Sequence, residues 1–69
     1  MKNRFLEIRL KLGYKYAKDF ASFLDISRST YSRFENNKDQ PGAEELFYAA
    51  KKLKIKMEDI IYEEEEPKE

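Results

Sequence analysis

Two arginines and several short polar side chains are concentrated in the stretch SRSTYSRFENNK, residues 27–38. Arg28 and Arg33 carry guanidinium groups, whose fork of donors matches the O6 and N7 acceptors of guanine. The small hydroxyl side chains of Ser29 and Ser32 lie between them and would fit against a groove wall. These residue types indicate recognition of a nucleic acid more readily than catalysis.

Less specific interpretations of the same stretch stay open at this point. Arg28 could be a solvated residue on a helix surface, and Arg33 could form an ion pair within its own helix. Tyr31 and Phe34 lie three residues apart, as on one side of a helix. We expect these two rings to belong to the hydrophobic core rather than to stack on bases.

The composition excludes several classes of site. The 69 residues include no cysteine and no histidine, which rules out disulfides and zinc sites of the usual thiolate–imidazole type. No paired acid, base and nucleophile is evident, so we expect no enzyme, no cofactor and no small-molecule ligand. No apolar run approaches the roughly 20 residues that span a bilayer. The charged N-terminus does not resemble a signal peptide, and we expect a cytoplasmic protein without a membrane partner.

The zero net charge conceals an asymmetry along the chain. Residues 1–62 hold 13 Lys and Arg against nine Asp and Glu, a net charge of +4, whereas residues 63–69 carry −4. A basic domain is consistent with a polyanionic partner. We expect the acidic segment 63–69 to be a disordered tail, and it could compete weakly with DNA for the basic face.

Apolar residues recur at helical spacing through most of the chain. The pattern predicts an all-α, compact five-helix domain over residues 1–62, because no single short helix could bury its apolar stripe alone. The expected helices span residues 2–12, 17–24, 28–36, 43–53 and 57–62. Their expected core positions are Phe5, Ile8, Leu12, Phe20, Ala21, Leu24, Tyr31, Phe34, Leu46, Phe47, Ala49, Ala50, Leu53, Ile60 and Ile61.

Capping residues set the expected ends of these helices. Asn3 and Ser27 are suitable N-caps for the first and third helices. Gly13 is placed to end the first helix in the left-handed conformation. Asp25, in the turn after the second helix, and Asn37, after the third, tolerate the same conformation better than most residues.

The segment from Phe20 to Phe34 has the pattern of a helix-turn-helix, in which the second helix is held outward by the first. Over residues 3–62 the chain resembles the lambda-repressor/Cro (Xre-type) family of DNA-binding domains. The matching residues are FASFLDISRSTYSRFENNKDQPGAEELFYAAKKLKIKMEDII. The resemblance implies a small bacterial or phage-type transcriptional regulator that binds double-stranded DNA with its third helix in the major groove.

The resemblance also implies roles for individual residues. Arg28, Ser29 and Arg33 would contact base edges, and Glu35 would form a salt bridge to a basic residue of the first helix such as Arg9. The expected contacts to the DNA backbone are Ala17, Lys18, Ser27, Ser32, Asn36 and Lys38.

Four departures from the family pattern affect these expectations. Asp25 and Asn37 replace two turn glycines, and the loop before the second helix is one residue longer than usual. Ala17 stands where the family often has a glutamine that contacts a phosphate, so Lys15 or Lys18 would have to supply that charge.

One recognition helix covers only a few base pairs, which favours a homodimer on two half-sites. The resemblance puts the dimer contact near the fourth and fifth helices, with Tyr48, Met57, Ile61 and Tyr62 as candidates. An alternative function is a protein-interaction or antitoxin-like module that keeps the fold but binds DNA weakly.

Overall fold

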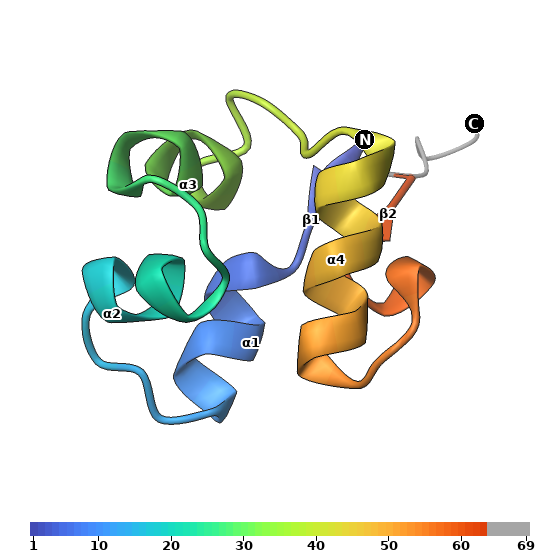
Figure 1. Cartoon of the computed structure of the whole chain (residues 1–69). Helices are drawn as coiled ribbons and strands as arrows, with labels where there is room; N and C mark the ends of the chain where they lie inside the picture. The colour runs from blue at the N-terminus through green and yellow to red at the C-terminus, as the bar shows by residue number, and fades with distance from the viewer. Residues whose placement is uncertain (64–69) are drawn as a thin grey trace, which may run out of the picture.

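The computed structural model describes residues 1–63, so the predicted acidic tail lies almost entirely outside the described residues. Within them, the α-helices are α1 (Phe5–Lys11), α2 (Ala17–Phe23), α3 (Arg28–Glu35) and α4 (Ala43–Leu53). A 3-10 helix η1 (Met57–Asp59) follows, and a strand β1 (Lys2–Asn3) pairs antiparallel with β2 (Ile61–Tyr62). Figure 1 shows α2 and α3 together on one side of the molecule and α4 on the other.

The all-α class is confirmed, but the expectation of five helices is wrong. The segment expected to be the fifth helix forms one turn of 3-10 helix and then the two-residue strand β2. Asp59 accepts a hydrogen bond from the Lys56 main-chain nitrogen, which closes this single turn. The strand begins at Ile61, a β-branched residue of a type that favours extended backbone. The main-chain oxygen of Ile60, just before it, accepts a hydrogen bond from the Arg4 nitrogen.

The first helix begins at Phe5 rather than at Lys2. The N-cap is Arg4 and not Asn3 as expected, although the Asn3 side-chain oxygen accepts a hydrogen bond of 3.1 Å from the Phe5 nitrogen. Residues 2–3 instead pair with residues 61–62, and this pairing brings the two ends of the domain together. Residues 2–3, which the local spacing predicted to be helical, therefore form a strand because they pair with residues distant in the sequence.

Among residues 1–63, three non-glycine residues adopt the left-handed conformation, two of them as expected. Asp25 and Asn37 both have φ 58°, and Gly13 ends α1 with φ 87°. Lys54 also has a positive φ, 60°, at the end of α4, which the sequence did not indicate. Asparagine and aspartate tolerate this conformation better than lysine does, and glycine adopts it at the lowest cost.

The core lies where the inner faces of all four α-helices and Ile60 meet. Phe5, Phe20 and Tyr31 are fully buried, and the Tyr31 ring contacts the rings of Phe5 and Phe20 edge to face at centroid distances of 5.8 and 5.6 Å. The expected burial of Leu12 and Phe47 is wrong, since they are 53% and 58% exposed. Leu12 is the residue that ends α1, and Phe47 lies off the α4 stripe formed by Ala49 and Ala50. The remaining expected core positions are buried or partly buried.

A polar cluster ties α1 to α3 beside this core. Arg9 Nε lies 2.9 Å from a carboxylate oxygen of Glu35, which confirms the expected salt bridge. The Tyr31 hydroxyl donates to the same oxygen at 2.6 Å. Arg9 also donates to the main-chain oxygens of Tyr14 and Lys15, which fixes the loop that precedes α2. Burial raises the pKa of Tyr31 well above its usual value, and the hydrogen bond to Glu35 adds to this effect.

Candidate nucleic-acid interface

The polar residues of α3 share one face of the helix. At about 100° per residue, Arg28, Ser32, Asn36, Ser29 and Arg33 fall within an arc of about 140°. All five are exposed in the structure. We call these five residues the α3 face. The opposite side of the helix is the apolar side, so the face points away from the domain.

Buried contacts orient the α3 face. Tyr31 and Phe34 are 0% and 3% exposed, and both rings pack against Phe5. Ser27 caps the helix, because its side-chain oxygen accepts a hydrogen bond from the Thr30 nitrogen. The local sequence thus gives a helix with a fixed start and a fixed rotation about its axis.

Arg28 lies in the first turn of α3 and is exposed. Among the described residues it takes part in no side-chain hydrogen bond or ion pair. Ser29 and Ser32 are exposed on the same face, and their side chains are too short to cover it. The middle of the α3 face therefore carries only short side chains, with a long arginine side chain toward each end.

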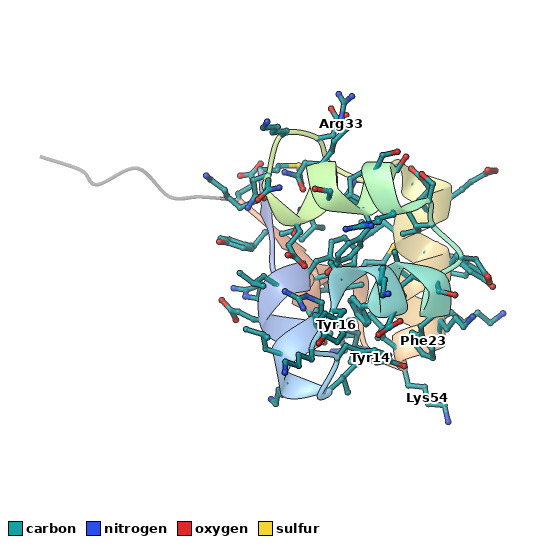
Figure 2. All side chains as sticks on the ribbon, turned by 90° about the vertical axis from the view of Figure 1, so that its left-hand side faces the viewer. Tyr14, Tyr16, Phe23, Arg33 and Lys54 are labelled. Atoms are coloured by element: carbon teal, nitrogen blue, oxygen red, sulfur yellow. The ribbon has the colours of Figure 1, made fainter. Side chains whose placement is uncertain are left out.

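Arg33 forms an ion pair, as the alternative interpretation allowed, but the partner lies outside α3. One terminal guanidinium nitrogen is 2.6 Å from a carboxylate oxygen of Asp39, and both side chains are at least half exposed. Figure 2 shows Arg33 projecting from α3 beyond the body of the molecule. Asp39 was not among the expected functional residues, because nothing in the local spacing shows how the loop after α3 turns back.

Two expected residues lie where α3 ends: Asn36, a member of the α3 face, and Lys38, in the loop that follows. Asn36 is exposed, and its side-chain nitrogen donates to the Ser32 main-chain oxygen at 2.9 Å. Lys38 is exposed, and its main-chain nitrogen donates to the Arg33 oxygen. Ser27 differs from these, since its hydroxyl donates to Thr30 Oγ1 at 2.8 Å and is already engaged as a cap.

Residues of the N-terminal strand hold this loop in place. The Asn3 side chain is 7% exposed and donates to the Phe34 main-chain oxygen at 2.6 Å and to Gln40 at 2.8 Å. The Asn3 main-chain nitrogen donates to the Asn37 side chain at 3.0 Å. Sequence reasoning missed this link, because more than 30 residues separate the partners.

The start of α2 carries the remaining expected residues. Ala17 is the first residue of α2 and is partly buried against the core, so only its main chain is available there. Lys15 and Lys18 are exposed, and their amino groups lie 5.7 and 5.9 Å from the centre of the Tyr16 ring. This basic cluster belongs to α2 and its loop, separate from the α3 face.

The turn between α2 and α3 is fixed from α4. The Asp25 carboxylate accepts hydrogen bonds from the Tyr48 hydroxyl at 2.8 Å and from Lys52 at 3.3 Å. These bonds, that from Tyr48 above all, lower the pKa of Asp25 below its usual value, and the Tyr48 pKa is raised in return. The Tyr48 hydroxyl thus bonds to the turn, while the side chain remains 46% exposed on α4.

Among residues 1–63 no cluster of three or more potential ligands could hold a metal ion. No described helix has the length and apolar character needed to cross a bilayer.

The family model described as "Helix-turn-helix" matches residues 6–60, which include α2, the turn and α3. No curated protein and no solved structure matches the chain significantly.

Proposed function

The chain belongs to the Xre/Cro-like helix-turn-helix family of DNA-binding regulators, and from this premise we propose that it binds double-stranded DNA in a sequence-specific way. The third helix enters the major groove. The regulator is of the small bacterial or phage type, and residues 1–62 form its DNA-binding domain.

The observation that carries this proposal is the composition and orientation of the α3 face. Its five members are polar or basic, all are exposed, and buried aromatic residues on the other side fix its direction. A major groove about 12 Å wide admits an α-helix presented in this way. The face combines two guanidinium groups with short side chains, which allows close approach to the base edges.

Base contacts come from Arg28, Ser29 and Arg33. Arg28 has its donors free among the described residues and lies at the N-terminal end of the helix, which in this class of motif contacts base edges. A bidentate contact from arginine to guanine contributes about 1–3 kcal/mol of discrimination. Arg33, one and a half turns later, reads a second position.

Contacts to the DNA backbone flank the helix on both sides. Ser32, Asn36 and Lys38 hold phosphates at the C-terminal edge of α3. Ala17, through its main chain, and Lys18 serve the edge formed by α2, with Ser27 at the turn. Such contacts set the register of the protein on DNA without reading sequence.

The domain acts as a homodimer through α4 and the segment after it. Phe47 and Met57 are 58% and 41% exposed and together line a depression of the surface. Met57 also lines a neighbouring depression with Ile61 and Tyr62. The two depressions share Met57, and their lining supports Met57, Ile61 and Tyr62 as contact residues. Tyr48, the fourth expected contact residue, is 46% exposed on α4, and Phe47 joins the set. Two-fold symmetry would then place two α3 helices on half-sites about 34 Å apart.

Selection of bound sites from random duplex DNA tests the proposal. We expect the wild-type chain to enrich a sequence with two-fold symmetry. An Arg28→Ala variant, selected in the same way, should enrich a sequence whose base preference is relaxed at one position of each half-site. The matched control is Lys11→Ala, which removes a basic residue of α1 and should select the wild-type sequence. A pool without enrichment would reject sequence-specific binding and favour the protein-interaction alternative.

A further inference from the structure

We propose that Asp39 is a specificity-determining positioning residue, which holds Arg33 in place for base contact and opposes binding to other DNA. The inference rests on the proposed function, because it assigns a role to Arg33 within that interface. The observations that carry it are the ion pair between the two residues and the way the main chain brings them together.

The main chain fixes Asp39 beside Arg33 independently of the side chains. The nitrogens of Lys38 and Asp39 both donate to the Arg33 main-chain oxygen, at 2.9 and 3.3 Å. The left-handed Asn37, held by Asn3, forms the bend that makes this return possible. The loop thus places the Asp39 main chain beside Arg33, where its side chain reaches the guanidinium group.

The ion pair engages only part of the guanidinium group. A terminal nitrogen of Arg33 lies 2.6 Å from Asp39 Oδ2, while the other nitrogens have no partner among residues 1–63. The Arg33 side chain remains 61% exposed. Five N–H donors are available on this group, so a paired Arg33 still has enough donors for a guanine edge. Restricting its rotamers before binding lowers the entropy lost on contact.

The negative charge of Asp39 lowers the affinity for DNA of any sequence, in contrast to its favourable effect on the base contact of Arg33. It is exposed at the edge of the α3 face, next to Lys38, where a DNA backbone would pass. A carboxylate there repels phosphates and competes with them for the Arg33 guanidinium group. Asp39 therefore weakens binding to every DNA sequence, and only a duplex that offers Arg33 its base contact compensates for this loss. Repulsion that acts on all duplexes thus increases the difference in affinity between the selected duplex and others.

The test uses the full chain, its selected duplex and a scrambled duplex of equal length. Asp39→Asn should raise affinity for the scrambled duplex more than for the selected one. The ratio of the two affinities should fall at least about five-fold, the lower end of what one base contact provides. In an Arg33→Lys background, which lacks the planar fork, the same change at Asp39 should leave the ratio unaltered.

The control variant is Glu7→Gln, an exposed carboxylate of α1 that forms no ion pair among the described residues. It should leave the ratio unchanged. The inference is overturned if Asp39→Asn changes both affinities by the same factor, or if its effect on the ratio persists without the guanidinium group. Failure of the wild-type chain to bind either duplex would instead reject the proposed function itself.

Discussion

Arg9 and Glu35 join α1 to α3 through an ion pair of 2.9 Å, and both side chains are largely buried, at 11% and 17% exposed. Arg9 also donates to two main-chain oxygens of the loop before α2. The Arg9 guanidinium group therefore connects α1, the loop before α2 and the C-terminal end of α3. The orientation of the α3 face depends on this connection as well as on aromatic packing.

Replacing Glu35 by alanine should destabilise the domain strongly. The change leaves Arg9 charged, mostly buried and without its partner, and removal of one member of a buried pair costs about 3–5 kcal/mol. For a domain of this size each kcal/mol shifts the melting temperature by about 4–8 °C. Thermal unfolding followed by circular dichroism measures the effect. Glu44→Ala, an exposed acid in the first turn of α4, is the control, and equal losses in the two variants would contradict the role of the pair.

Tyr31 should make the domain sensitive to alkaline pH. Its pKa is raised in the folded state, mainly by burial, so the folded protein retains a proton that the unfolded chain releases above about pH 10. The stabilisation is complete below this pH and declines above it, by about 1.4 kcal/mol per pH unit. Tyr31→Phe lacks this decline, although it loses the hydrogen bond to Glu35 at every pH.

Urea unfolding of the two proteins at pH 8 to 11 provides the measurement for Tyr31. The wild type should be the more stable protein at the lower pH values, and its advantage should shrink as the pH rises. An advantage that stays constant across this range would show that the Tyr31 hydroxyl keeps the same proton affinity in both states.

Lys54→Gly should stabilise the domain by about 1 kcal/mol, because Lys54 adopts φ 60° at the end of α4, where glycine carries no steric penalty. The Lys54 side chain extends away from the fold (Figure 2), so little packing is lost. Lys56→Gly, at φ −82°, should lower stability slightly instead. Chemical unfolding of both variants checks this, and a loss of stability in Lys54→Gly would contradict the account of this helix end.

Lys38→Ala should weaken binding to all duplexes by a similar factor. Lys38 is exposed at the edge of the α3 face and is proposed to neutralise one phosphate. Its loss should reduce the slope of log affinity against log salt by about one. Salt titrations with the selected and the scrambled duplex measure this slope. A loss confined to the selected duplex would mean that Lys38 reads a base rather than a phosphate.

Local sequence rules accounted for most of the helices and for the α3 face. The helical spacing places Arg28, Ser29 and Ser32 on one side of α3 and Tyr31 and Phe34 on the other. This was sufficient to predict the orientation of α3, because a helix rotates by a fixed angle per residue. The limits of α4 and the left-handed Asp25 followed from equally local signals.

Features that depend on contacts between distant residues were not predictable in this way. Pairing of residues 2–3 with residues 61–62 converted an expected fifth helix into a turn and a strand. The partner of Arg33, the carboxylate of Asp39, depends on a loop that bends back through Asn37 and is held by Asn3. The apolar spacing of α4 likewise did not show that Phe47 is exposed.

The most direct test of the central claim is the affinity of the wild-type chain for its selected duplex and for a scrambled duplex over a range of salt concentrations. If the α3 face enters the major groove, log affinity should fall linearly with log salt, with a slope of about −0.9 for each phosphate neutralised. The selected duplex should bind more tightly than the scrambled one at every salt concentration. Equal affinities for the two duplexes that do not change with salt would contradict the account.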